Sequence, residues 1–541
     1  MQKIFLFFLS IIVSSSTLAQ SNNFELIKGM ELMDLIYQNL EMHFVDEPKP
    51  GKLSKVAIDA MLKELDPYTV YYHEANMEDY RMMTTGQYGG IGALIRKIDN
   101  CIYISEPYEG NPAQKAGLKA GDKIISIDGK DMCNKPSDDV SSALKGPKGT
   151  TIQVKVLRDG KEIIIPITRD EIKIPDVPYA GIIGNNVGYI KLNSFTQTAS
   201  EEVIKAFKEL KEKGMKELIL DLRGNGGGLL IEAVKIVNMF VPKDQLVVST
   251  KGRIQDENKI YKTMDEPLDV NIPLAVLIDE GSASASEIVS GSLQDLDRAV
   301  IIGTTSYGKG LVQRTFDLKY GSKMKLTIAK YYTPSGRCVQ KLEYYDKVEG
   351  ERPHAIADSL IKKFKTKNGR EVIDGRGIEP DLKITEKEFS RLTAMLVTKN
   401  FIFNYATQYA NKHPSIVDAA NFKLSNEEYE DFKKLVLKDT FDYTTASEEM
   451  LRKMRKTAEE EGYFEESKSE YEALFKKLTP SKESDLEKFK TEISNILENE
   501  IVSRYYYQKG RTLHAFRTDN FIEKALEIIQ NPKEIHTILK K

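Results

Sequence analysis

The sequence predicts a multidomain α/β protein that ends in a helical region. Its 541 residues exceed the size of one typical domain, and its 41% hydrophobic content is ordinary for a globular chain. Apolar runs of strand length are followed by a small-residue turn and a helical pattern at Lys216–Phe240 and again at Pro273–Leu296. From about residue 386 the composition turns to Lys, Glu and Tyr, and apolar residues follow helical spacing at Ile493, Leu497, Ile501 and Tyr505. We expect three or four domains.

The charge balance argues against nucleic acid and anionic membranes as partners. Lys and Arg number 78 and Asp and Glu 81, which gives a net charge of −3, and no basic block occurs. The cysteines Cys101, Cys133 and Cys338 form no metal-ligand pattern, and neither a metal site nor a cofactor is predicted. They permit at most one disulfide and leave an odd thiol.

The first 19 residues have the pattern of a secretory signal peptide. Lys3 precedes an apolar core from Ile4 to Val13, and small residues end at Ala19, where we expect cleavage. The alternative is a retained membrane anchor, but the apolar run is shorter than the roughly 20 residues that span a bilayer. The sequence therefore predicts export.

Ser284 is the first candidate for a catalytic residue. It lies in the turn Glu280–Glu287, between the predicted strand and helix, where unpaired N–H groups and the helix dipole stabilise a developing oxyanion. A structural alternative uses the same residues, because Ser284 and Glu287 also fit a capping box that needs no catalysis.

Lys309 is a candidate general base, 25 residues after Ser284 (309 − 284) and between two glycines. An isolated buried ammonium is costly, so a lysine among apolar and small residues tends to lose its proton. Taken alone, the segment also fits a surface lysine in a glycine turn. No histidine lies between His73 and His354, so a Ser-His-Asp triad would need a base from a peripheral segment. A Ser/Lys pair is the simpler prediction.

These motifs resemble those of the carboxyl-terminal processing, or tail-specific, proteases. The resemblance rests on Gly281–Ile288, Leu293–Asp295 and Tyr307–Gln313, which have the order and spacing of that family. It implies a serine peptidase with a crotonase/ClpP-like core and no cofactor. It implies that Ser284 is the nucleophile, Lys309 the base and Gln313 the residue that orients the lysine, with Ala285 N–H as an oxyanion donor and Glu287 and Asp295 in supporting roles.

The glycine turn Gly224–Gly228 follows the other strand-like run and resembles a second motif of the same family. A P-loop is excluded because no Gly-Lys-Ser/Thr follows, and the dinucleotide fingerprint fails because position 229 is leucine. The resemblance implies that the N–H of Gly226 or Gly227 is the second oxyanion donor, and it leaves the choice open.

Residues 86–170 resemble a PDZ domain, through the glycine-rich start Tyr88–Ile95 and the later segment Gly121–Gly129. Such a domain adds a peptide strand to its sheet edge and captures the terminal carboxylate with loop N–H groups. The resemblance places the peptide-binding residues at Gly90, Ile91, Gly92, Ala93 and Leu94. The alternative is an ordinary hairpin with a glycine cluster.

The predicted organisation is a signal peptide (1–19), an N-terminal helical region (20–85), the PDZ domain (86–170), the peptidase core (171–385) and a helical C-terminal domain (386–541) that caps the core or mediates oligomers. The predicted function is an exported serine endopeptidase of the bacterial periplasm or cell envelope that selects polypeptides by their C-termini. A homo-oligomer or an adaptor protein is compatible with this organisation. The alternatives are a PDZ scaffold on a catalytically inactive core, and an acyl transferase or esterase, which would leave the PDZ domain unexplained.

Overall fold

The computed structural model describes residues 2–74, 77–344, 353–385, 388–441, 443–479 and 481–540, with side chains from residue 23 onward. The chain forms two compact units. The first comprises Met1–Glu74 and Gln313–Thr327, and the second comprises Ala75–Val312 and Ile328–Lys541.

The first unit contains two helices and parts of three strands, one of which is β17 (Leu311–Asp317). The helices are α1 (Gln2–His43) and α2 (Pro50–Lys63), and strand β1 (Val70–Tyr72) pairs antiparallel with the start of β18 (Lys323–Tyr332). The apolar side chains of Leu26 and Met30 on α1 are exposed. Among the described residues, no helix has the length and apolar character needed to cross a membrane.

The second unit begins with a small β-domain whose main sheet has the strand order β3-β4-β5-β7-β8, so β3 lies at its edge. The alternating residues of β4 and β7 fill its core, because side chains in a strand point to opposite faces in turn. Helix α5 (Ser137–Leu144) contacts β3. The strands are β3 (Ala93–Ile98), β4 (Cys101–Pro107), β5 (Lys123–Ile127), β7 (Thr151–Arg158) and β8 (Lys161–Thr168); β2 (Gln87–Gly90) pairs with β9 (Asp170–Lys173).

A six-stranded sheet of order β10-β11-β12-β15-β16-β23 forms the centre of the second unit. All neighbours in it are parallel except β10 and β11. Helices α6, α7 and α8 cover one face. The elements are β10 (Tyr179–Ile183), β11 (Val187–Lys191), α6 (Ala199–Glu212), β12 (Glu217–Asp221), α7 (Leu230–Asn238), β15 (Leu274–Ile278), α8 (Ala285–Asp295), β16 (Val300–Gly303) and β23 (Leu382–Lys383).

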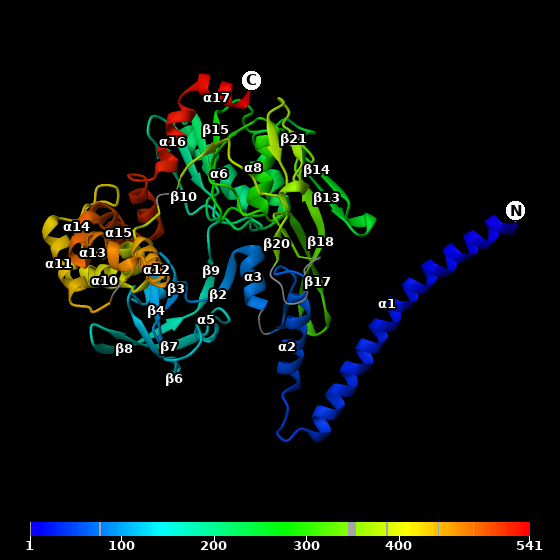
Figure 1. The fold of residues 1–541 in the computed structure, drawn as a ribbon, viewed down its shortest axis with the longest axis horizontal. Coiled ribbons are helices and arrows are strands. Elements are labelled where there is room, and N and C mark those ends of the chain that lie inside the picture. Colours follow the sequence, from blue (N-terminus) through cyan, green and yellow to red (C-terminus); the bar gives the residue numbers. More distant parts are fainter. Residues whose placement is uncertain are drawn as a thin grey trace. The chain divides into compact units, whose positions relative to one another are not determined.

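The last two helices of the chain cover the opposite face of this sheet. Leu218 and Leu220 of β12 face the α6–α8 side, whereas Ile219 faces α16 (Asn520–Ile529) and α17 (Pro532–Leu539). Buried on both faces, the strands are continuous apolar runs, as parallel sheets require. The C-terminal region was predicted to be a separate helical domain. Its last two helices, α16 and α17, instead pack on the central sheet and so form part of the hydrophobic core of the predicted peptidase domain (Figure 1).

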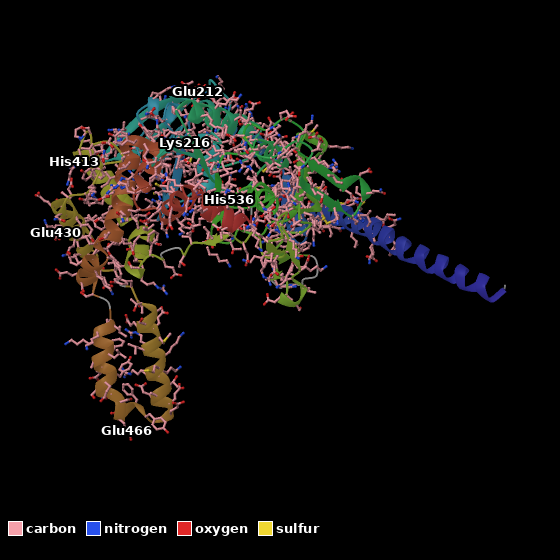
Figure 2. All side chains as sticks on the ribbon, turned by 90° about the horizontal axis from the view of Figure 1, so that it is seen from above. Glu212, Lys216, His413, Glu430, Glu466 and His536 are labelled. Atoms are coloured by element: carbon pink, nitrogen blue, oxygen red, sulfur yellow. The ribbon has the colours of Figure 1, made fainter. Side chains whose placement is uncertain are left out.

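The rest of the C-terminal region forms its own helical core. Helices α9 (Arg391–Thr398), α10 (Phe401–Lys412), α11 (Asn426–Leu437), α14 (Lys482–Lys488) and α15 (Lys490–Ala515) share one apolar cluster. Helices α12 (Ala446–Glu461) and α13 (Phe464–Leu478) pair around a smaller one that contains Leu451 and Tyr471, and Figure 2 shows this pair projecting with Glu466 at its tip.

Candidate active site

The serine turn joins β15 to α8 and holds Ser284 in an unusual backbone conformation. Ser284 has φ 57° and ψ −111°, whereas an N-cap residue ordinarily has extended backbone. A non-glycine residue in the left-handed region is strained and persists only where its surroundings fix it. The backbone therefore favours a functional role for Ser284 over a simple cap.

Only one of the three serines in the turn is accessible. Ser282 and Ser286 are fully buried, and their hydroxyls donate to the carbonyls of Leu222 (2.9 Å) and Asn225 (2.8 Å). Ser284 is partly exposed. The geometry therefore distinguishes Ser284 from its neighbours as the serine that a substrate can reach.

A buried carboxylate joins the serine turn to the lysine loop. Glu287 is fully buried and accepts hydrogen bonds from the N–H groups of Ser284 (2.8 Å), Gly308 (2.7 Å) and Lys309 (2.9 Å), and from the Ser306 hydroxyl (2.6 Å). Burial raises the pKa of the Glu287 carboxyl, and these four donors oppose that rise. The capping glutamate thus also fixes Lys309, which the capping box alone did not predict.

Tyr331 forms a second link between the same two segments. Its ring is buried, and its hydroxyl donates to the Ser284 carbonyl (3.3 Å) while its backbone N–H donates to the Gly310 carbonyl (2.9 Å). Because Gly310 follows Lys309 directly, one residue of β18 contacts both the serine turn and the lysine loop.

The glycine turn Gly224–Gly228 packs against the serine turn. Ala283 N–H donates to the Asn225 carbonyl (3.0 Å), and a Cβ at Gly227 would lie 2.8 Å from the Ser284 Cβ and 2.9 Å from the Ala285 nitrogen. Only glycine permits this approach. The N–H of Gly227 donates to the Asn225 side chain (2.9 Å), so it is already engaged.

A buried ion cluster holds the strand end before the glycine turn. Asp221 is fully buried and accepts hydrogen bonds from Arg223 (2.6 Å), Lys191 (3.1 Å) and Tyr189 (2.6 Å). Burial alone would raise the pKa of Asp221, but Arg223 and Lys191 outweigh it and lower that pKa well below its usual range. Arg223 also pairs with Asp519 (2.8 Å), the N-cap of α16, so the C-terminal helices are tied to the glycine turn.

Asp295 and Gln313, two other residues predicted from the family resemblance, form hydrogen bonds with residues outside the serine turn. Asp295 is buried and accepts from Thr333 (2.5 Å), the Ser335 N–H (3.0 Å) and Arg337 (2.8 Å), so it fixes the loop after β18. Gln313 belongs to the first unit, where its amide donates to the Thr327 hydroxyl (3.1 Å).

The predicted carboxylate loop lies between β2 and β3 of the small β-domain. The carbonyls of Ile91 and Gly92 accept hydrogen bonds from the N–H groups of Ala113 (2.7 Å) and Tyr108 (2.9 Å), so these bonds engage the acceptors of the loop. Leu94 is 39% exposed on the edge strand β3. Gly90, at the end of β2, pairs with Asp170, and Ala93 begins β3.

Comparison with known proteins identifies the family. The model of peptidase family S41 matches residues 186–349, the PDZ domain model residues 81–157, and the model named probable PDZ-protease, C-terminal helical domain, residues 392–529. A carboxy-terminal-processing protease of Bartonella bacilliformis is 36% identical over 350 residues, which cover 64% of this chain and 80% of that protein. The chain therefore belongs to the family of carboxy-terminal-processing proteases. A "Probable CtpA-like serine protease" of Staphylococcus haemolyticus is 31% identical over 399 residues, 73% of each chain, and CtpB of Bacillus subtilis is 35% identical over 320 residues, 58% of this chain and 66% of that protein.

Membership in this family establishes a serine-type peptidase with a PDZ domain and a C-terminal helical domain, which confirms the predicted fold class and enzyme class. Two residues that contact the serine turn or Glu287, Tyr331 and Ser306, were not predicted from the sequence. Tyr331 lies in a segment rich in tyrosine and threonine, and nothing in its spacing indicates that its hydroxyl reaches a turn 47 residues away.

Proposed function

We propose that the protein is an exported endopeptidase that cleaves polypeptides with a Ser284/Lys309 centre after its PDZ domain engages their C-termini. The observation that carries the proposal is the Glu287 carboxylate, which hydrogen-bonds the backbone of Ser284 (2.8 Å) and of Lys309 (2.9 Å). Two residues that are distant in sequence are thereby held by one buried group. The resemblance of their motifs to the family pattern supports the same pair.

The proposed reaction is acyl transfer through a covalent intermediate. Lys309, as the neutral amine, takes the proton of Ser284 while its oxygen attacks the peptide carbonyl, and the resulting ammonium then protonates the leaving amine. The Ala285 N–H, at the first position of α8, is one oxyanion donor. We assign the second donor to Gly226, because the Gly227 N–H is engaged by Asn225. The resemblance of its motif to the family pattern supports Gln313 as the residue that orients the lysine.

The PDZ domain would supply substrate selection. Its edge strand β3 is suited to pair with an extended peptide, and the N–H groups of Gly90–Gly92 are suited to a terminal carboxylate. Leu94, which is exposed on that strand, fits an apolar contact with the bound tail. The pattern of residues 1–19 supports export into the bacterial envelope.

The decisive experiment uses an unstructured protein with a free apolar C-terminus as substrate. We expect Ser284→Ala to abolish cleavage while circular dichroism shows an unchanged fold, and the matched controls Ser282→Ala and Ser286→Ala to retain most activity. Cleavage by folded Ser284→Ala would refute the assignment. An inactive wild-type chain that still binds the tail would support the alternative, a PDZ scaffold on an inactive core.

A further inference from the structure

The PDZ domain contains a pair of cysteines whose sulfur atoms lie unusually close together. Cys101 and Cys133 are 32 residues apart in the sequence, yet their Sγ atoms are 2.7 Å apart. A disulfide bond is about 2 Å long, so only a small further approach is needed for bonding. Neither cysteine belongs to the catalytic centre or the carboxylate loop.

The backbone brings the two segments together independently of the sulfur atoms. Cys101 begins β4 opposite Ile98, at the turn of the β3–β4 hairpin. Next to it, the N–H of Asn134 donates to the carbonyl of Asn100 (2.7 Å), so the residues that flank the two cysteines are also hydrogen-bonded to each other. The close approach of the thiols is therefore part of the fold.

Both thiols are also accessible to an oxidant, since each is partly exposed. The third cysteine, Cys338, lies elsewhere, in the peptidase core, where a Cβ at Gly310 would be 3.1 Å from its sulfur. A unique pairing is thus available among the three cysteines, and Cys338 stays as the odd thiol.

We propose that Cys101 and Cys133 form a disulfide that ties the turn of the β3–β4 hairpin to the segment before α5. Cys101 lies just beyond the end of the edge strand β3, and Cys133 lies four residues before α5 (137 − 133), the helix that contacts β3. The bond would close a loop that spans β4, β5 and β6 (Lys130–Asp131). A cross-link of this kind limits how far the hairpin and the α5 segment separate when the domain opens.

The bond requires an oxidant, for which a small-molecule disulfide such as oxidised glutathione suffices. A thiolate of one cysteine attacks that disulfide, forms a mixed disulfide and expels one glutathione thiolate. The second cysteine then attacks the mixed disulfide and expels the other glutathione. Two protein thiols are oxidised and one glutathione disulfide is reduced to two thiols, so electrons and protons balance.

The test incubates the full chain with oxidised glutathione, alkylates the remaining thiols under denaturing conditions and maps peptides without reduction. We expect one alkylated cysteine, Cys338, of the three in the chain, and one linked peptide pair that contains Cys101 and Cys133. Cys338→Ser should keep the link. Cys101→Ser and Cys133→Ser should each lose it and capture glutathione at the remaining member of the pair. Hydrogen exchange should be slower in residues 99–101 and 132–136 of the oxidised chain than of the reduced chain.

Three outcomes would overturn the proposal. Alkylation of both Cys101 and Cys133 after incubation would show that the bond does not form, and a link from either to Cys338 or to a second chain would show a different pairing. Equal hydrogen exchange in the oxidised and reduced chains would refute the tying of the hairpin to the segment before α5. These readouts need no peptidase activity, so they do not depend on the proposed catalytic centre.

Discussion

The candidate catalytic centre and the predicted peptide site are held in place by different kinds of interaction. At the candidate centre a buried side chain, Glu287, fixes two loops through four hydrogen bonds. At the predicted peptide site, backbone bonds to the carbonyls of Ile91 and Gly92 fix the loop between β2 and β3, and β3 stands at a sheet edge. A reaction needs preset atoms, whereas recognition of varied tails relies on backbone donors. The difference predicts that point changes harm the centre more than the peptide site.

Apart from Ser284→Ala, which should abolish cleavage, the largest effect is expected from Lys309→Ala. If Lys309 is the base, its loss should reduce kcat/KM roughly 10²- to 10⁴-fold, the usual contribution of a general acid–base group. In the wild-type chain, kcat/KM should rise with pH, because only the neutral amine accepts the serine proton. Lys309→Arg is the matched control that keeps the positive charge, and it should be as inactive because a guanidinium does not lose its proton. A Lys309→Ala chain with the wild-type pH profile would exclude this role.

Glu287→Gln tests whether the hydrogen bonds of this side chain position Ser284 and Lys309. The amide is similar in shape, but it places an NH2 group where a carboxylate oxygen accepted hydrogen bonds from backbone N–H groups. A buried hydrogen-bond donor then faces another donor, and the bond is lost. A hydrogen bond to a charged group contributes about 1.5–3 kcal/mol. We expect kcat to fall about 10- to 150-fold, at about 1.4 kcal/mol per decade, with KM changed little.

Ser306→Ala is the matched control for Glu287→Gln, because it removes one of the four bonds (2.6 Å) and leaves the carboxylate in place. Its activity should lie between the wild type and Glu287→Gln. If Glu287→Gln loses only thermal stability and keeps its kcat, the glutamate is a helix cap and does not position the centre.

The sequence revealed the components of this centre better than their connections. The apolar runs and small-residue turns predicted both strand–turn–helix units, and the family motif singled out Ser284 and Lys309. Glu287 was predicted as a cap because its bond to Ser284 is local, but its bond to Lys309 depends on how the chain returns to the sheet edge. For the same reason, composition and helical periodicity predicted a helical C-terminal region without showing that α16 of this region covers the peptidase sheet.

The predicted peptide site should respond to a change in the substrate rather than in the protein. If the loop N–H groups bind the terminal carboxylate, amidating an apolar C-terminus removes the charge that they bind, at a cost of about 1.5–3 kcal/mol. Binding should therefore weaken about 10- to 150-fold. Fluorescence anisotropy with three tails on one substrate, free apolar, free acidic and amidated apolar, gives this comparison. Folded Ser284→Ala should bind them with the same ranking, and equal binding of all three would disprove tail selection.

Tyr331→Phe should give the smallest effect, and the reason lies in the partner of its hydroxyl. The Ser284 carbonyl also accepts the Ile288 N–H (2.9 Å), so the bond from Tyr331 (3.3 Å) is its second. Phenylalanine keeps the buried ring and leaves the backbone bond to Gly310 intact. A neutral hydrogen bond contributes about 0.5–1.5 kcal/mol, which corresponds to a decrease in kcat of about 2- to 12-fold. A decrease beyond 100-fold would place the hydroxyl in the chemistry itself, and unchanged kcat would show that the helix bond alone fixes the Ser284 carbonyl.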